Sequence, residues 1–563
     1  MATPRHDDRF DASRALARRR GWPGDRLVQS LAQARKEQAS APAHWAPQVA
    51  DRFGLPHAAA LGPATYYADL TAPHGRRHVR VCSATACFAA LGGRHVDAVE
   101  QELGVRAGCV TPDAATSLQA VRCLGYCYAA PAALDGTVPC TGASLAAQLA
   151  GREPPAAPEI PASDRTGDPV LLVAGTPDET AWQVWPRTVA RASADEVYGE
   201  VAASGLRGRG GAGFRVAAKW GAVRRAPGPD RVVVANGDEG DPGSFADRLL
   251  LERYPERVLE GLALACFACG AGRGLVLVRS EYPRALDSVR RAVARAYEDG
   301  HLGAAVHGTA TALDVDVVSG SGSYVAGEET ALIAGLEGGR GCARVRPPYP
   351  TERGVWDRPT VVNNVETLAA IPWIVSRGGA AYARRGTASE TGTKLVSLSE
   401  RFARPGAYEV EIGTSVEHIV TELGGGLKGG AELAVLQIGG PLGGFLSADS
   451  LDVPLTEADL AARGAALGHA GLVALDRSVD PVEVLRHFWE FAAAESCGAC
   501  SPCRVGARRG RELATAGSAP GQEWARLSRV MEQASLCAFG RRLPAAVGSL
   551  ARAYGGRLPG WDA

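Results

Sequence analysis

Eight of the thirteen cysteines fall into two groups whose spacing suits metal ligation. The first group joins two pairs, Cys82 with Cys87 and Cys123 with Cys127. Four thiolates from two loops are the usual ligand set of an iron–sulfur cluster. Zinc is the competing metal, although it favours closer pairs and often takes histidine as well. The spacing therefore predicts a two-iron cluster, with zinc and ordinary thiols or disulfides as the alternatives.

The second group is denser and lies near the carboxyl end of the chain. Cys497, Cys500 and Cys503 follow one another at every third position, and Cys537 comes later. Three thiols on a loop that enters a helix can occupy three corners of a cubane, and a distant fourth cysteine can close it. Pro502 helps to fix that loop, because proline restricts the backbone φ angle. These residues predict a four-iron cluster, with a zinc site as the alternative.

The other five cysteines predict no metal site. Cys266 and Cys269 share the CxxC spacing, but they lie in an apolar stretch, where free cysteines commonly pack into a core. The remaining three are also interpreted as structural: Cys109, Cys140 and Cys342. Because the total is odd and we expect no secretory signal, the cysteines indicate a reducing compartment and not a disulfide framework.

A glycine-rich run at 208–214 could bind a phosphate or a flat ring. Its Gly208, Gly210 and Gly213 match the GxGxxG dinucleotide fingerprint, which normally follows a strand and opens a helix. Here a helical pattern precedes the run and the first clear strand follows it, so the match alone is weak and a flexible turn is the alternative. Glycines let backbone N–H groups approach a ligand closely. The side chains that could neutralise a phosphate or stack on a ring are Arg207, Arg209, Lys219 and Phe214.

Polar side chains follow two predicted strands, at the position where ligands of α/β sheets usually bind. The glycine-rich stretch 320–327 also opens a helix, which suits an anionic phosphate. The acidic pair after it would repel an anion, so we interpret those residues as hydrogen-bond acceptors for a ribose or an amide. A solvated loop is the alternative for 236–243. The candidate cofactor-binding side chains in these segments are Asn236, Asp238, Glu239, Asp241, Tyr324, Glu328, Glu329, Asn363 and Asn364.

The elements that would position these residues change in type along the chain. Strands at 231–235, 274–278 and 313–318, with a helix at 283–298, indicate a parallel α/β domain. Prolines mark a linker before it. The predicted division is a helical bundle at 1–75, a small α/β domain at 76–150, the linker at 151–194, the parallel α/β domain at 195–380, a β-rich module at 390–476 and a helical domain at 480–557.

The composition excludes several classes of protein. The chain has 563 residues, so it should contain several domains. Hydrophobic residues make up 46%, and 61 Lys+Arg balance 61 Asp+Glu, which excludes general disorder and disfavours nucleic-acid binding. The longest apolar run, 262–271, is too short to cross a membrane, and acidic residues interrupt the basic amino-terminal segment. We therefore expect a soluble, cytoplasmic protein that binds no nucleic acid and does not insert into a membrane.

Five motifs between residues 195 and 555 resemble one family, in the family's own order. They are similar to the NADH-binding flavoprotein subunit of respiratory complex I, a module that also occurs in NAD-dependent molybdenum or tungsten formate dehydrogenases and NAD-reducing hydrogenases. Residues 1–150 resemble the partner subunit of that module, so two subunits of the family are fused here. The motifs are Gly205–Phe214, Asn236–Arg248, Tyr324–Leu332, Asn363–Thr367 and Glu495–Arg504.

This resemblance implies a multidomain α/β fold and four cofactors. The expected parts are the helical bundle, a thioredoxin-like 2Fe-2S ferredoxin domain, a Rossmann-like FMN/NADH domain, a ubiquitin-like β-grasp (SLBB) domain and a helical 4Fe-4S domain. FMN would be bound by Gly208, Arg209, Gly210, Gly211, Gly213, Lys219, Asn236, Asp238, Tyr324, Gly327, Glu328, Asn363 and Asn364. NAD(H) would stack against Phe214, with further contacts from Glu329, Asp241, Arg346 and Tyr349.

The resemblance also implies a mechanism without a catalytic acid or base in the chain. A hydride would pass between nicotinamide and flavin, and single electrons would pass through the four-iron cluster to or from a catalytic subunit that carries further iron–sulfur clusters. The run Gly237–Asp241 and the fusion look more like the formate dehydrogenase and hydrogenase branch. We therefore expect the beta subunit of a metal-dependent formate dehydrogenase. The alternatives are a hydrogenase diaphorase, a complex I subunit and a flavin-free electron relay.

Three positions depart from the family pattern. Arg215–Ala218 replaces the usual continuation of the glycine-rich loop, and Ala222 stands where the family has an aromatic residue. The pocket could therefore be thinner on one side. Arg346 stands where the family often has lysine, which leaves the choice between NAD and NADP open. The role of the two-iron cluster, as an electron store or as a branch, is also open.

Overall fold

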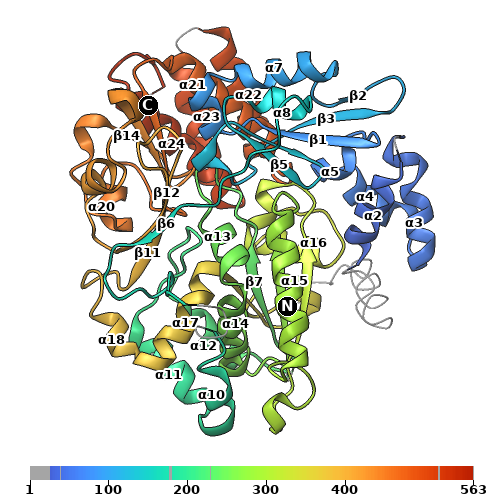
Figure 1. Cartoon of the computed structure of the whole chain (residues 1–563), viewed down its shortest axis with the longest axis vertical. Helices are drawn as coiled ribbons and strands as arrows, with labels where there is room; N and C mark the ends of the chain where they lie inside the picture. The colour runs from blue at the N-terminus through green and yellow to red at the C-terminus, as the bar shows by residue number, and fades with distance from the viewer. Residues whose placement is uncertain (1–25, 39, 176–180, 229, 518–519, 562–563) are drawn as a thin grey trace, which may run out of the picture.

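The computed structural model describes residues 26–38, 40–175, 181–228, 230–517 and 520–561, and Figure 1 traces them from the amino end in blue to the carboxyl end in red. A small group of helices begins the described chain, with Leu31, Trp45 and Val49 buried between them. Residues 1–25 of the predicted bundle lie outside the described residues. The helices are α2 (Leu27–Lys36), α3 (Ala46–Phe53), α4 (His57–Ala64) and α5 (Ala68–Thr71).

A five-stranded mixed sheet follows, in the order β2-β3-β1-β4-β5. Its central strand β1 is parallel to β3 and antiparallel to β4. Val79 and Val81 of β1 lie in one buried cluster with Val99 of α7, and Arg80 between them is also buried, so both faces of this part of the strand are covered. The strands are β1 (Arg77–Cys82), β2 (Cys109–Val110), β3 (Thr116–Val121), β4 (Ala132–Asp135) and β5 (Val138–Thr141), and the helices are α6 (Thr85–Leu91), α7 (Arg94–Leu103) and α8 (Leu145–Leu149).

The described part of the proline-rich segment, 151–175 and 181–194, is more ordered than a free linker. Its strand β6 (Ala162–Asp164) pairs in parallel with β12 (Gly406–Glu411) of the β-rich module. The carboxylate of Glu409 accepts hydrogen bonds from the backbone N–H groups of 170–172 at 2.9–3.1 Å. The segment ends in helix α10 (Trp185–Arg191). Prolines predicted the break in pattern, but the long-range pairing partner was not visible in the sequence.

A parallel sheet forms the centre of the cofactor region, in the order β10-β7-β8-β9. The predicted strands and the helix at 283–298 are present, and β10 is an additional edge strand that places Asn364 opposite Asn236 of β7. The strands are β7 (Val232–Gly237), β8 (Arg273–Val278), β9 (Asp314–Ser319) and β10 (Thr360–Asn364). The helices are α11 (Ala194–Ser204), α12 (Val216–Arg225), α13 (Ala246–Arg253), α14 (Pro255–Cys269), α15 (Pro283–Glu298), α16 (Glu329–Leu336), α17 (Val365–Arg377) and α18 (Gly379–Ala383).

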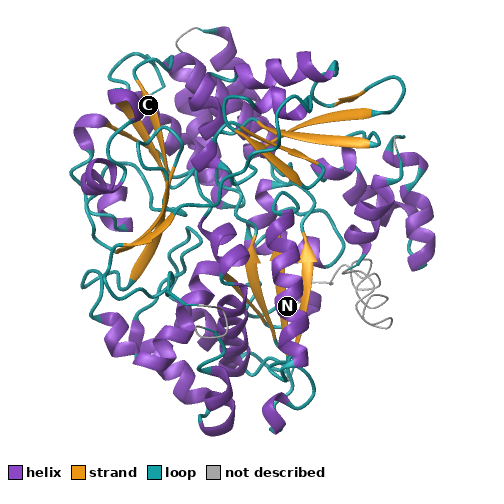
Figure 2. Cartoon of the chain, in the orientation of Figure 1, coloured by secondary structure: helices purple, strands orange, loops and turns teal. Residues whose placement is uncertain are grey.

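The β-rich module and a group of helices complete the chain, and Figure 2 shows the helices gathered beside the sheets. The module's sheet has the order β14-β13-β15-β11-β12-β6. Its remaining elements are β11 (Thr393–Leu398), β13 (Leu433–Ile438), β14 (Phe445–Ser447), β15 (Gly471–Asp476), α19 (Val416–His418) and α20 (Glu457–Ala462). The final helices are α21 (Pro481–Glu495), α22 (Ser501–Ala516), α23 (Gly521–Ala534) and α24 (Ala538–Ala553).

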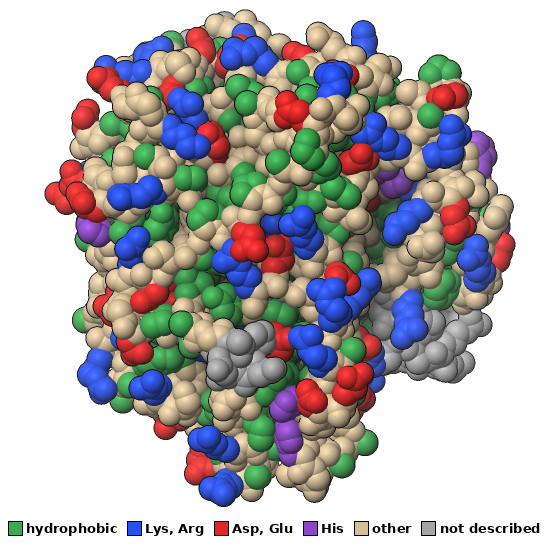
Figure 3. Space-filling view, viewed as in Figure 1, with side chains coloured by type: hydrophobic (Ala, Val, Ile, Leu, Met, Phe, Trp, Pro, Cys, Tyr) green, Lys and Arg blue, Asp and Glu red, His purple; other side chains and the backbone are tan. Residues whose placement is uncertain are grey.

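Most parts of the chain contribute to one extensive core, whereas the first helices have a small core of their own. A single cluster of buried side chains runs from Cys82 to Trp561 and includes Cys266 and Cys269, as predicted for those two cysteines. In the face that Figure 3 shows, basic and acidic side chains are intermingled, in keeping with the balanced composition. Among the described residues, no helix has the length and apolarity needed to span a membrane.

Candidate functional site

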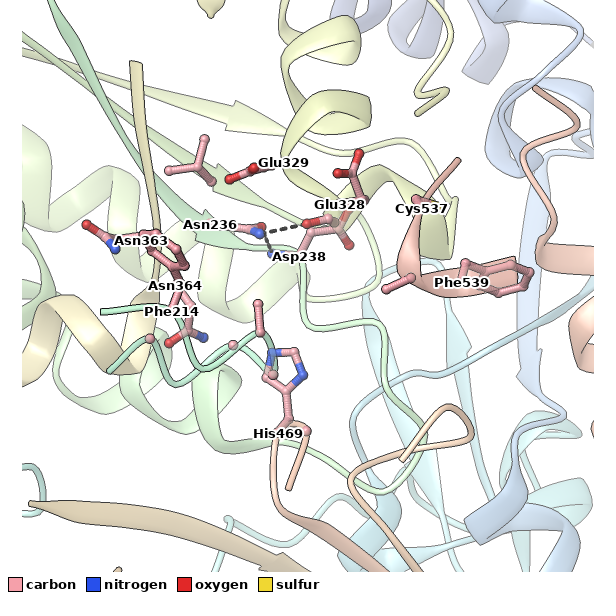
Figure 4. A pocket seen from close by; sticks show the side chains of 18 of the residues that line it. Phe214, Asn236, Asp238, Glu328, Glu329, Asn363, Asn364, His469, Cys537 and Phe539 are labelled. Atoms are coloured by element: carbon pink, nitrogen blue, oxygen red, sulfur yellow. Dashed lines mark hydrogen bonds between the residues drawn. The ribbon is translucent and has the colours of Figure 1, made fainter. Parts of the chain in front are cut away.

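A cavity of about 830 Å³ lies at the carboxyl ends of β7 and β10, and Figure 4 shows it from close by. Its size is within the range of small-molecule pockets in proteins. The predicted segments that line it are the glycine-rich loop 208–214, the polar loop 236–241, the 324–329 loop and the end of β10. The β-rich module and the start of α24 close the other side. Segments that are distant in sequence therefore meet at one cavity.

The glycine-rich loop lies between α11 and α12, as its sequence context indicated. Gly208 N donates to Phe214 O at 2.9 Å, which closes the loop on itself. A Cβ on Gly210 would come within 2.8 Å of the Cβ of Asn364, and a Cβ on Gly240 within 2.7 Å of the Tyr324 ring. These positions need glycine because the backbone approaches a neighbour too closely for a side chain. The resulting cradle fits a flat cofactor.

Most of the predicted cofactor residues line this cavity. Arg209, Gly213 and Glu239 do not. The guanidinium of Arg209 donates to Tyr382 and Thr391, away from the cavity. Glu239 is 1% exposed and accepts hydrogen bonds from the start of α13. The predicted residues in the lining are Gly208, Gly210, Gly211, Phe214, Lys219, Asn236, Asp238, Asp241, Tyr324, Gly327, Glu328, Glu329, Arg346, Tyr349, Asn363 and Asn364.

Two basic side chains contact the acidic pair Glu328 and Glu329 in the cavity wall. Glu329 accepts from Lys219 Nζ at 2.9 Å and from Arg346 at 2.8 Å. Burial alone would raise the pKa of Glu329, but the charges of Lys219 and Arg346 hold it below its usual value. Glu328 accepts from the backbone N–H groups at 330 and 331 and thus caps α16. Both carboxylates are therefore held in place as hydrogen-bond acceptors.

The paired asparagines have protein partners of their own. Trp220 Nε1 donates to Asn363 Oδ1 at 2.8 Å, and Asn364 Nδ2 donates to both oxygens of Asp247 at 2.7 and 2.8 Å. Asn236 Nδ2 donates to Gly327 O at 2.9 Å. These hydrogen bonds give the three asparagines partners within the protein. They line the cavity as amides that the protein already holds in place.

Asp238 is the most perturbed acid of the predicted set. It lies in the polar loop between Asn236 and Gly240, and burial raises its pKa to about 7. Arg279 lowers this pKa, whereas Glu281 and Glu495 add to the rise. Burial of a carboxyl group beside a cavity is unfavourable for the protein alone. It makes Asp238 able to accept or donate a hydrogen bond near neutral pH.

Sequence reasoning missed His469, which comes from the loop before β15 and lines the cavity. Its Nδ1 lies 2.8 Å from Asp241 Oδ2, and Tyr324 donates to Asp241 Oδ1 at 2.5 Å. No motif in the β-rich module indicated a ligand. Only the contact with Asp241, which is distant in sequence, gives this histidine a place at the site.

The first cysteine group is assembled as predicted, from the end of β1, α6 and the loop after β3. Cys123 Sγ and Cys127 Sγ are 3.3 Å apart, and Cys82 and Cys87 contact the same group through their thiols. Gly243 N, on the loop that follows Asp241, lies 3.3 Å from Cys127 Sγ. In the described residues, no set of three or more His, Cys, Asp or Glu side chains surrounds a single metal-ion position. Four mutually contacting thiols instead suit a cluster that spreads its ligands over two irons.

The second group meets at two helix amino termini. Cys500 is the N-cap residue of α22 and Cys537 is the N-cap residue of α24, while Cys503 lies in the first turn of α22. Charge effects between Cys503 and the other three thiols show that the four lie together. Helix amino termini stabilise negative charge, so this donor set suits an anionic cluster. Cys537 also lines the large cavity, which places this thiol group directly at the cofactor site.

One cysteine interpreted as structural lies beside the second group. Cys342 Sγ is 3.5 Å from Cys497 O, and the two thiols interact. The Cys342 thiol lowers the pKa of Cys497, although burial acts in the opposite direction. Tyr66 of the amino-terminal helices donates to the adjacent Gly341 O at 2.7 Å. The spacing of Cys342 in the sequence gave no indication of this position.

Three segments of the chain match known families. Residues 14–139 match the thioredoxin-like [2Fe-2S] ferredoxin family. Residues 201–373 match the Nuo51 FMN-binding domain, and residues 483–558 match the iron-sulfur binding region of NADH-ubiquinone oxidoreductase-F. The three matches cover both cysteine groups and most of the cavity lining, but not the lining residues between 439 and 469.

Individual proteins show the same similarity. The chain is 39% identical to NADP-reducing hydrogenase subunit HndC of Solidesulfovibrio fructosivorans, over 62% of this chain and 72% of that protein. It is 40% identical to a subunit of the NADH-quinone oxidoreductase of Escherichia coli (56% and 71%) and 33% identical to the alpha subunit of the NAD-reducing hydrogenase HoxS of Cupriavidus necator (78% and 75%). A crystal structure of an NAD+-reducing [NiFe]-hydrogenase in the H2-reduced state superimposes with a TM-score of 0.84 at 31% identity, covering 96% of this chain and 92% of that one.

Proposed function

Because the chain belongs to the family of NADH-binding flavoprotein (diaphorase) subunits of NADH-quinone oxidoreductases and NAD-reducing hydrogenases, we propose that it passes electrons between NAD(H) and the catalytic subunit of a metal-dependent formate dehydrogenase. The family is an NAD-dependent oxidoreductase family with FMN, 2Fe-2S and 4Fe-4S cofactors. The observation that carries the proposal is the single cavity that joins the nucleotide-type loops to Cys537. A flavin in that cavity would be adjacent to a cluster ligand.

The residues that would hold the cofactors are the predicted ones that line the cavity, together with the eight grouped cysteines. FMN fits the cradle of Gly208, Gly210 and Gly211, with the polar loop and the paired asparagines around it. The eight grouped cysteines fit the two clusters by their number, contacts and helix-terminal positions. When bound, FMN supplies the exchange between hydride transfer and single-electron transfer. The chain itself has only to bind and orient the cofactors and to shield them from solvent.

Two exposed aromatic rings would orient the nucleotide. Phe214 is 57% exposed and Tyr349 is 52% exposed, although both line the cavity. Exposed rings at the mouth of a pocket offer flat apolar faces for the bases of a dinucleotide. The fixed carboxylate of Glu329 lies near them and would accept hydrogen bonds from ribose hydroxyls or the nicotinamide amide. Lys219 and Arg346 keep it in one position.

A direct test uses the purified full-length chain with FMN and both clusters. It should oxidise NADH with ferricyanide as acceptor, and Glu329→Ala should raise the KM for NADH about tenfold while FMN stays bound. Glu298→Ala, at an exposed position of α15 outside the cavity, is the matched comparison and should leave the KM unchanged. If the wild-type chain binds no flavin and oxidises no NADH, the diaphorase assignment is wrong.

The choice of formate as electron donor rests on two features of the chain. The run Gly237–Asp241 and the fusion of the ferredoxin part to the flavoprotein part resemble the formate dehydrogenase and hydrogenase branch. Purification of the native complex tests it. We expect a co-purifying subunit with molybdenum or tungsten, and NAD+ reduction that depends on formate.

An NAD-reducing hydrogenase is the second candidate. It is favoured by the superposition that covers 96% of this chain, including both the ferredoxin and the flavoprotein parts. In this case the native complex should contain nickel and should reduce NAD+ with hydrogen and not with formate. A complex with neither metal and neither activity would contradict both donors while leaving the diaphorase assignment intact.

A further inference from the structure

Two glycine turns of the β-rich module reach the cofactor cavity and place His469 in its wall. A Cβ on Gly468 would lie 2.3 Å from Gly439 O, and a Cβ on Gly440 would lie 2.6 Å from Asp241 Cγ. Because such distances leave room only for hydrogen, the turns must contact each other and the Asp241 loop through their backbones. The position of His469 is therefore set by close backbone packing.

The ring of His469 lies between two carboxylates. Nδ1 is 2.8 Å from Asp241 Oδ2, and Nε2 is 4.0 Å from Asp247 Oδ2. The exposed fractions of these side chains are 15% for His469, 10% for Asp241 and 2% for Asp247. Tyr324 holds the second oxygen of Asp241. Both nitrogens of the ring therefore face acceptors, which is the arrangement expected for a protonated imidazole.

The charges around the ring favour its protonated form. Burial opposes it, but Asp241, Asp247 and Glu239 raise the pKa of His469 to about 9. Behind them, Glu366 and Lys394 form a buried ion pair that also acts on Asp247. Asn364 donates to Asp247, and Ser244 donates to Glu239. At neutral pH the positive ring is therefore surrounded by acids, with the Glu366–Lys394 ion pair behind them.

We propose that His469 is a positioning residue for the cofactor: it fixes Asp241 in the cavity wall and presents a positive charge to bound flavin. The inference rests on the proposed function, since it needs FMN in the cavity. A fixed positive charge stabilises the negative charge of reduced flavin more than the neutral oxidised form. Without that charge, Asp241 would face the flavin uncompensated and would disfavour reduction. His469 should therefore raise the reduction potential of the bound flavin.

The test compares His469→Asn with His418→Asn in the full-length chain loaded with its cofactors. Asparagine can still donate to Asp241 but carries no charge, and His418 is an exposed histidine in the same module. Both variants should retain FMN. We expect the ratio of reduced to oxidised FMN affinity to fall about tenfold in His469→Asn only, which lowers the two-electron potential by about 30 mV. The difference should shrink as the pH rises through about 9, where wild-type His469 loses its proton.

The measurements are FMN content and the flavin potential, determined by spectroelectrochemistry from pH 6 to pH 10. A His469→Asn potential equal to that of His418→Asn at every pH overturns the inference but not the proposed function. If wild-type protein binds no FMN, the proposed function itself fails. Should His469→Asn not fold, His469→Gln serves for the same measurement, because its amide is also neutral.

Discussion

At the scale of single residues, burial beside the cavity changes the pKa of a carboxyl group. Asp238 is the clearest case among the predicted residues, because burial raises its pKa from 3.8 to about 7. A carboxyl group whose pKa is higher in the folded state stabilises the fold at low pH. That contribution is lost as the pH rises from about 4 to about 7.

Replacement of Asp238 by asparagine tests this balance. Without cofactors, the variant should gain stability relative to wild type as the pH rises, because asparagine does not ionise. The difference in the free energy of unfolding, variant minus wild type, should be about 1–3 kcal/mol larger at pH 8 than at pH 4. FMN affinity should fall at the same time, since a polar contact is altered. Asp452→Asn, at an exposed position, is the control and should show neither change. Denaturant unfolding at both pH values gives the answer, and a pH-independent difference would contradict the prediction.

Substitutions at Cys500 and Cys342 distinguish a predicted cluster ligand from a cysteine that only lies beside the cluster. Cys500→Ser should remove the EPR signal of the four-iron cluster and block electron transfer to the partner, yet leave flavin reduction by NADH. Cys342→Ser should keep that signal, because Cys342 lies beside Cys497 and is not one of the predicted four ligands. Loss of the signal in Cys342→Ser, or its survival in Cys500→Ser, would mean that the ligand set is wrong.

At the scale of elements, turns and strand ends determine the shape of the site. The predicted strands were recognisable because continuous valine-rich runs are typical of buried parallel strands. The edge strand β10 and the strand β6 were not predicted, because both are short and follow prolines. Each depends on a partner strand elsewhere in the chain, and no local pattern reveals such a partner.

The close contact of Gly210 with Asn364 gives an element-scale prediction. Gly210→Ala should weaken FMN binding at least about tenfold, because the added Cβ would lie 2.8 Å from the Cβ of Asn364 and displace the loop or β10. Gly199→Ala is the matched control, since a Cβ there has no neighbour within 4 Å. In helix α11 it should raise stability by about 0.5–1 kcal/mol. Fluorescence titration with FMN measures the affinities, and equal affinities in the two variants would contradict the proposed cradle.

At the scale of the whole molecule, the ferredoxin part packs directly against the flavoprotein part, so the linker is not the only connection between them. The guanidinium of Arg248 lies 3.7 Å from the centre of the Tyr126 ring and donates to Gly125 O at 2.8 Å. Phe88 stacks on His487 of α21 with ring centres 4.4 Å apart. Ser280 donates to the partly buried Asp69 of the first helices. These contacts cross from one ancestral part to the other.

A cut in the exposed stretch 151–155 tests this packing. After insertion of a specific protease site there, the two fragments should still co-elute at the mass of the intact chain. Arg248→Ala should allow them to separate in the cut protein, because it removes a buried cation–π contact with Tyr126 and the hydrogen bond to Gly125 O. Arg290→Ala, at an exposed position of α15, should not. Fragments that separate without any substitution would show that the linker alone joins the parts.

The sequence alone determined the cysteine quartets, the main strands and helices and the nucleotide-type loops, because each depends on spacing or periodicity within a short segment. It also indicated the family, through five motifs in order. The tertiary structure decided that Arg209 and Glu239 face away from the cavity and that the paired asparagines already have partners. It also decided that Cys537 and His469 join the cavity wall. Each of these placements depends on contacts between segments that are distant in sequence, and such contacts form only when the loops around the cavity pack together.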